Sequence, residues 1–239
     1  MKRYIIFLCS ILVAINLFAQ KENTSVVVDD NITSYLTAVN EYSVIYSGKE
    51  EPIYRNYISN HPYLGTDGFR KGLVSFDGRI YPDLLLRLNQ DLGELIVWTP
   101  GNRSIMIPKD RIDYAIIESS EPLLLLYHTP ESADGSVLPE GFYVRLHNGE
   151  SQVWKRETAA LLSKIVDYQV EYYFAKRSRI YVYMNGTYYP VSSKKSLLKL
   201  FSSKKSELKN YIKQSKLNFR KDTENAIVAA AEYFDELNK

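Results

Sequence analysis

Hydrophobic and polar residues alternate through the middle of the chain, between Phe69 and Val191. Short runs of β-branched and aromatic residues recur there, and such residues favour the pleated, half-buried surface of a sheet. Asx-Gly dipeptides, which suit the positive φ angles of tight hairpin turns, separate several of the runs. They begin at Asp67, Asp77, Asp134, Asn148 and Asn185. Consecutive hairpins predict an antiparallel meander of at least eight strands, either an open sheet or a partial barrel.

The period of the pattern changes after Val191. Ser193, Ser203 and Asp222 are residue types that cap helix N-termini, and apolar residues at helical spacing follow each of them. This predicts helices over about 194–201, 205–214 and 223–237. The whole pattern therefore predicts an α+β fold, a mainly antiparallel β meander followed by a C-terminal three-helix segment.

Two stretches are less clearly patterned. Ala159 to Val166 has apolar residues at helical spacing, yet strands are predicted on both sides of it, so both interpretations stay open. Residues 20–68 combine a stretch of helical spacing with a segment rich in Tyr, Asn, Pro and Gly, which predicts an irregular or helical region. The expected organisation is a leader over 1–19, this region over 20–68, a β body over 69–191 and a basic helical segment over 192–239, packed on the body.

The first residues have the order of a secretory signal peptide. Lys2 and Arg3 precede an apolar stretch, and small Ala19 lies before a polar continuation that begins at Gln20. The apolar stretch is shorter than the about 20 residues of a spanning helix. We therefore expect cleavage before Gln20, export, a location in the periplasm or at the outer membrane of a bacterial envelope, and no transmembrane segment after cleavage. Cys9, the one cysteine, would leave with the leader, so disulfides and thiolate metal sites are not expected.

A resemblance supports the same compartment. The segment from Tyr183 to Phe201 and the segment from Lys216 to Asp222 are similar to parts of exported, signal-peptide-bearing proteins of Bacteroidota that have no known activity. The turn from Phe76 to Tyr81 and the strand from Glu140 to Tyr143 resemble earlier parts of the same pattern. The likeness covers about residues 68–239, and its motifs are structural. It implies export and carries no catalytic residue.

Charge is distributed unevenly. Removing Lys2 and Arg3 from the 30 basic residues leaves 28, which balance the 28 acidic residues. Between Ser192 and Lys221, however, nine Lys and one Arg stand against one acid, Glu207. Such asymmetry marks a docking face for an anionic partner, or a segment that pairs with the acidic body of its own protein or is simply solvated. The candidate binding residues are Lys194, Lys195, Lys204, Lys205, Lys209 and Lys213.

Tyrosine is abundant, with 20 residues, and several crowd the last predicted hairpin. Tyr181 and Tyr183 share one face of their strand because alternate strand residues face opposite sides. They are candidate ligand contacts, since Tyr combines a large apolar area with a polar tip. The alternative is that they fill a half-wet face of an antiparallel sheet.

Motifs of known chemistry are absent from the sequence. The three histidines are not spaced as a local metal pair, and the sequence has no nucleophile elbow or phosphate-binding glycine loop. We predict no cofactor and no metal, and export argues against nucleic acid as a partner. The leading hypothesis is a non-enzymatic envelope protein, an accessory or binding subunit whose partner is an envelope protein or an anionic membrane surface. The alternatives are an envelope hydrolase acting on glycans through carboxylates not located in sequence, and a structural protein that contacts the membrane through its basic tail.

Overall fold

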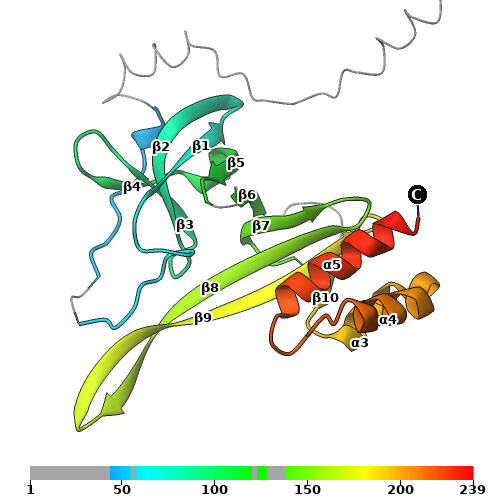
Figure 1. The fold of residues 1–239 in the computed structure, drawn as a ribbon. Helices are drawn as coiled ribbons and strands as arrows, with labels where there is room; N and C mark the ends of the chain where they lie inside the picture. Colours follow the sequence, from blue (N-terminus) through cyan, green and yellow to red (C-terminus); the bar gives the residue numbers. More distant parts are fainter. Residues whose placement is uncertain (1–43, 55–56, 120–122, 129–137, 239) are drawn as a thin grey trace, which may run out of the picture.

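The computed structural model describes residues 44–54, 57–119, 123–128 and 138–238. The predicted signal peptide and the hairpin turn predicted at Asp134 lie outside these ranges. Figure 1 shows a strongly curved sheet from which one long hairpin projects, with the helices at the opposite side.

The sheet has ten antiparallel strands in the order β10-β9-β8-β7-β6-β5-β1-β2-β3-β4. Two meanders, β1 to β4 and β5 to β10, join through the antiparallel β1–β5 pair. The predicted α+β fold is confirmed, and the sheet is open. The strands are β1 Arg70–Phe76, β2 Arg79–Asn89, β3 Glu94–Trp98, β4 Ser104–Met106, β5 Ile112–Ile117, β6 Leu123–His128, β7 Gly141–Asn148, β8 Gln152–Val166, β9 Gln169–Met184 and β10 Thr187–Val191.

Two of the predicted Asx-Gly turns have the expected backbone. Asp77 and Gly78 have φ angles of 51° and 70°, and Asn185 and Gly186 have 53° and 78°. Both central residues of a type I′ turn need positive φ, which glycine adopts without a steric cost. The ambiguous stretch from Ala159 to Val166 is the second half of β8. The stretch is a strand despite the helical spacing of its apolar residues, because β9 pairs with it along its whole length.

Short 3-10 helices flank the strands and helices: η1 Val44–Tyr46, η2 Lys109–Arg111 and η3 Ser202–Lys204. The C-terminal helices are α3 Lys194–Leu200, α4 Lys205–Gln214 and α5 Thr223–Glu236. Ser193 and Asp222 accept first-turn backbone N–H groups, as caps should. The cap predicted at Ser203 is wrong. Ser203 lies within η3, and α4 begins after Lys204 without a side-chain cap, because the chain turns directly from one helix into the next.

Two hydrophobic clusters make up most of the core. The first lies inside the curved β1–β5 half and includes Phe76, Leu86 and Leu95. The second lies between the helices and the strands β8 to β10, where the rings of Phe201 and Phe234 stack 4.0 Å apart. Helix α5 packs on β7 and β8, and α3 packs on β10. The helical segment is therefore part of the folded body. Across the described ranges, every helix is too short or too polar to cross a membrane.

Candidate functional site

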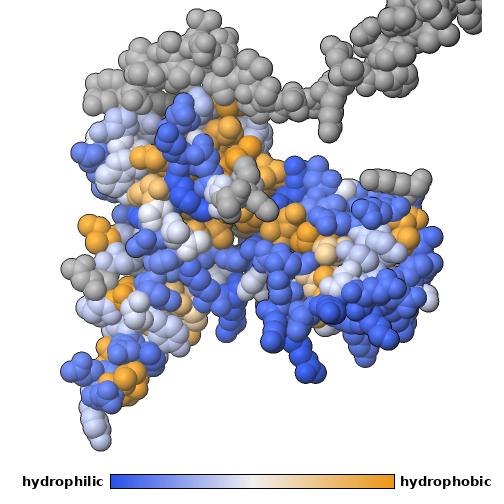
Figure 2. Space-filling model, in the orientation of Figure 1, coloured by the Kyte–Doolittle hydropathy of each residue, from blue (hydrophilic) through white to orange (hydrophobic). Residues whose placement is uncertain are grey.

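Helices α3 and α4 bury their apolar residues and expose lysines, which gives this part of the molecule a basic surface. Leu197, Leu198, Leu208 and Ile212 face the core and are buried. Side chains three and four positions apart lie on one face of a helix, so burial of this stripe turns the intervening lysines outward. Figure 2 shows hydrophilic side chains covering this region of the surface.

A shallow groove runs across the exposed side of α3 and the start of α4. Its volume is about 580 Å³, and its apolar floor includes Leu198. The lysines that line it are exposed, and they come from both helices. We call it the lysine groove, lined by Lys194, Lys195, Leu198, Lys199, Ser202, Lys205 and Lys209.

Four of the six predicted lysines meet in the lysine groove: Lys194, Lys195, Lys205 and Lys209. Lys204 and Lys213 do not line it, and Lys204 is half-buried. Lys199 also lines the groove, although it is not among the residues predicted from the sequence. Its spacing of four residues from Lys195 places it on the same helix face, which is the signal that could have found it.

The lysines of α3 and α4 take part in none of the ion pairs found among the described residues. Lys155 provides the contrast, because its Nζ lies 3.0 Å from both Glu157 and Glu224 and ties β8 to α5. Burial lowers the pKa of Lys155, but the two carboxylates outweigh burial and hold the pKa above its ordinary value. The interpretation in which the basic segment pairs with acids of its own body is therefore not what the described contacts show.

The two candidate tyrosines are placed differently from the lysines. Tyr181 is only 3% exposed, and it packs with Leu138, Tyr143 and Trp154 in a small third cluster. Its ring is thus part of the interior. Tyr183 is half-buried, and its ring lies 4.7 Å from that of Tyr188. Both tyrosines therefore pack against neighbouring side chains on one face of the sheet, and they do not form an exposed aromatic surface for a ligand.

A second concavity lies between the β2–β3 turn and the strands β7 and β8. This polar cleft has a volume of about 300 Å³ and includes the acids Asp91, Glu140 and Glu157. Its side chains contact one another: Gln90 Nε2 donates to Glu157 at 2.7 Å, and Lys109 lies 3.8 Å from Glu140. Three carboxylates thus line one cleft, and two of them already have partners, because Glu140 lies near Lys109 and Glu157 accepts from Gln90.

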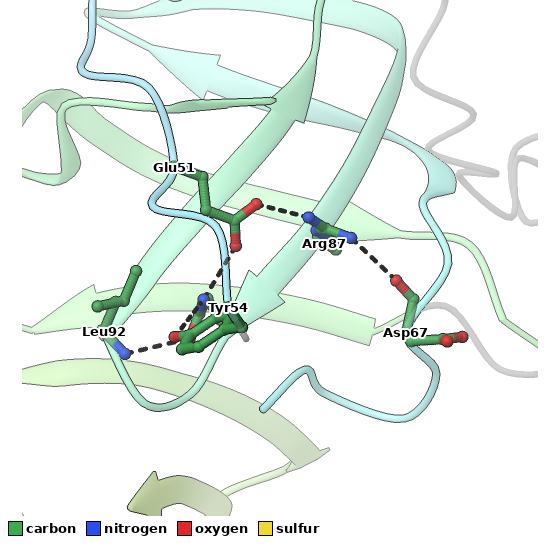
Figure 3. A network of polar contacts seen from close by, with 6 residues as sticks. Glu51, Tyr54, Asp67, Arg87 and Leu92 are labelled. Carbon is green, nitrogen blue, oxygen red and sulfur yellow. Dashed lines mark hydrogen bonds and ion pairs between the residues drawn. The ribbon is translucent and has the colours of Figure 1, made fainter. Parts of the chain in front are cut away.

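Figure 3 shows a buried polar network that joins the segment before β1 to β2. Glu51 is 6% exposed, and its carboxylate accepts from Arg87 Nη2 at 2.5 Å and from Asn89 Nδ2 at 2.9 Å. Arg87 also donates to the backbone oxygen of Asp67 at 3.1 Å. Its guanidinium lies 4.0 Å from the centre of the Tyr63 ring, as in a cation–π contact.

Burial in this network affects its phenols. Desolvation raises the pKa of Tyr63 to about 12, with the nearby Glu51 carboxylate acting in the same direction. Desolvation also raises the pKa of Tyr54, whose hydroxyl donates to Asp91 at 3.1 Å. Apart from Arg87 Nε, which is buried without a hydrogen-bond partner, the polar groups of the network hold Glu51, Tyr54 and Asp67 on the sheet, so we assign it a structural role.

Among the described residues, His, Cys, Asp and Glu side chains form no group of three that could hold a metal ion. Comparison with known proteins finds no matching family model, no similar curated protein and no similar solved structure. The candidate site therefore depends on the geometry and charge of this chain alone.

Proposed function

We propose that this chain is an exported, non-enzymatic accessory or binding subunit of a bacterial envelope, and that its lysine groove holds an acidic segment of a partner protein. The observation that carries the proposal is the concentration of exposed lysines, without carboxylate partners among the described residues, around an apolar floor at Leu198. Charge of one sign in a concave site attracts the opposite charge and speeds encounter. The apolar floor adds a place for a non-polar side chain of the partner.

The shape of the site favours a protein segment over a membrane surface. Helix α3 has 7 residues and α4 has 10, so each presents at most about three helical turns to a bilayer. The apolar residues of α3 and α4 are also used in the core of the protein. Little apolar surface is left on these helices for insertion between lipids.

The test compares two triple charge reversals. The groove variant is Lys195→Glu, Lys205→Glu and Lys209→Glu; the matched control is Lys216→Glu, Arg220→Glu and Lys221→Glu, which changes the net charge equally outside the groove. The probes are a synthetic peptide of alternating Glu and Leu, vesicles of phosphatidylglycerol with phosphatidylcholine, and vesicles of phosphatidylcholine alone. We expect the groove variant to lose at least about tenfold in peptide affinity, equivalent to about 1.4 kcal/mol, while its melting temperature is unchanged.

The salt dependence and the control variant test whether binding is electrostatic and whether it is specific to the groove. Peptide binding should weaken as salt rises past about 0.15 M, where the Debye length is about 8 Å. Equal losses in both variants would show that only net charge matters and would reject the groove. Binding to phosphatidylglycerol vesicles without binding to the peptide would support the membrane-contact alternative instead.

The glycan-hydrolase alternative is tested at the polar cleft, where Asp91, Glu140 and Glu157 lie. If the wild-type protein released sugars from envelope glycans and Glu157→Gln abolished that release, the protein would be a hydrolase and the binding proposal would fail. The contacts of Glu157 with Gln90 and Lys155 are the reason that we favour binding.

A further inference from the structure

The longest hairpin of the sheet extends well beyond its neighbours. β8 pairs with β7 only from Gln152 to Lys155, and β9 pairs with β10 only from Ile180 to Met184. The remaining part of the hairpin projects away from the helices, as Figure 1 shows. We call residues 159–176 the arm. Because a two-stranded hairpin alone is at best marginally stable in water, the arm needs contacts beyond its own pairing.

Its β9 edge has such contacts near the base. Ile58 forms a parallel bridge with Tyr172, and Asn60 Nδ2 donates to the backbone oxygen of Phe174 at 2.9 Å. The ring of Tyr54 meets that of Phe174 edge-on at 5.0 Å. This edge of the arm has therefore already accepted an added segment of chain.

The opposite edge, on β8, is open. Ala159 N donates to the backbone oxygen of Gln90 at 3.1 Å, and beyond this bond no described segment other than β9 pairs with β8. Along a strand, successive N–H groups point to opposite sides. The N–H of Ala159 points away from β9, so the backbone groups of Leu161, Ser163 and Ile165 point to the same open edge.

The open edge has few of the features that block strand pairing. Residues 160–166 contain no proline, glycine or acid, and the one charged residue, Lys164, pairs with Glu171 at 3.1 Å. Proteins usually protect a free edge with charge, proline or a bulge. Leu161, Ile165 and Val170 are 42%, 77% and 56% exposed. Figure 2 shows the hydrophobic side chains near the end of the arm.

The tip is unusual as well. Asp167 and Tyr168 both have positive φ, 48° and 63°, without a glycine, and Tyr168 is fully exposed. A bulky residue with positive φ is a backbone outlier, and such strain persists mainly where it serves a function.

We propose that the β8 edge of the arm, residues 160–166, pairs antiparallel with the same edge of a second copy of this chain. Ser163 is the centre of the open stretch, so a two-fold axis there places residue 160 of one copy opposite residue 166 of the other. Leu161 then lies opposite Ile165, and each such pair exchanges both backbone hydrogen bonds. The odd-numbered face carries no formal charge at residues 161, 163 and 165, so two copies meet there without like-charge repulsion.

The same register explains where the tip goes. The paired stretch ends at Val166, so the turn at Asp167 and Tyr168 of one copy approaches the place where Ala159 of the other copy bonds to Gln90, beside the polar cleft. The exposed Tyr168 ring therefore gains a neighbouring surface on the second copy. A two-fold contact of this kind is closed, so it gives a dimer and not a fibre.

The test uses the absence of cysteine outside the leader. In the Cys9→Ser background, Ser163→Cys should form a disulfide-linked dimer under mild oxidation. Opposed residues of a hydrogen-bonded pair have Cα atoms about 5.5 Å apart, within the range that a disulfide spans. The control Ser178→Cys, exposed on β9 of the same hairpin, should remain a monomer on a denaturing gel.

Sedimentation velocity tests the edge without a cross-link. The wild type should dimerise with rising concentration, and Ser163→Pro and Ile165→Lys should be monomers at the same concentration. Gln169→Lys, exposed on the β9 side of the tip, should still dimerise, and all variants should keep the wild-type melting temperature of the monomer. A wild type that stays monomeric, a dimer that survives both edge variants, or a dimer that Ser163→Cys does not cross-link would overturn the proposal. So would a monomer whose arm binds phosphatidylcholine vesicles, which would assign the arm to a membrane.

Discussion

His147 on β7 and Asp235 on α5 are 88 residues apart in sequence, and His147 Nε2 lies 2.8 Å from Asp235 Oδ2. The other carboxylate oxygen of Asp235 accepts from the backbone N–H of Ser151 at 2.9 Å and from its hydroxyl at 2.7 Å. A Cβ atom on Gly149 would lie 1.9 Å from Asp235 Oδ2, so only glycine leaves room for this contact. The contact fixes the last helix, and with it the helical segment that carries the lysine groove, to the β body.

Asp235→Ala should lower the free energy of unfolding by about 1–3 kcal/mol. The reason is that Asp235 is 6% exposed, and its removal leaves buried donors of Ser151 without an acceptor. Urea denaturation measures the change. Glu232→Gln on the same helix is the control, because Glu232 is largely exposed and lies 3.8 Å from His147; we expect a change within about 0.5 kcal/mol. Equal stability of Asp235→Ala and the wild type would show that α5 is held by its apolar contacts alone.

Glu51→Ala should be more damaging, with a loss of about 3–5 kcal/mol in the free energy of unfolding. It removes one partner of a buried ion pair and leaves the Arg87 guanidinium between aromatic rings without its carboxylate. The neighbouring Glu50→Ala is a suitable control, because Glu50 is exposed. Chemical denaturation followed by circular dichroism gives both values. A loss below about 1 kcal/mol would mean that the segment before β1 contributes little to the fold.

The protein should lose stability in alkaline solution partly through Tyr63. Burial raises the pKa of this phenol to about 12, against about 10 in an unfolded chain. A folded pKa above the unfolded one means that the stabilisation is complete below about pH 10 and is lost as pH rises towards about 12. Melting temperatures measured from about pH 8 to about pH 11 should therefore fall less steeply in Tyr63→Phe than in the wild type. Superimposable profiles would exclude a contribution from Tyr63.

Local patterns predicted most of the secondary structure. The residues at which α3 and α5 begin were predicted from the N-caps Ser193 and Asp222. Their side chains accept hydrogen bonds from first-turn amides only three residues away. The turn at Asn185-Gly186 followed from residues that tolerate positive φ. The turn at Asp167-Tyr168 could not be predicted in this way, because its tyrosine is a poor residue for that backbone and only the pairing of β8 with β9 imposes it.

The candidate site was only partly visible in the sequence. The excess of lysine between Ser192 and Lys221 can be read directly from the sequence. The helical spacing of apolar residues around Leu197 and around Leu208 indicated which face of each helix is buried. Which lysines meet depends on the turn between α3 and α4, which brings Lys209 to the groove and leaves Lys213 outside it. The burial of Tyr181 could not be predicted either. Alternation along a strand defines two faces, but it does not indicate which face is covered by other side chains of the fold.

By itself, the sequence determined the antiparallel meander, the three helices and the basic segment, because these depend on interactions between residues close in the chain. The tertiary structure alone decided that the strand order passes from β5 to β1, that His147 meets Asp235, and that no described strand other than β9 pairs with residues 160–166 of the arm. These features depend on contacts between residues far apart in sequence. Their free energy comes from burial and hydrogen bonding across elements, and no local pattern of residues specifies which elements will meet.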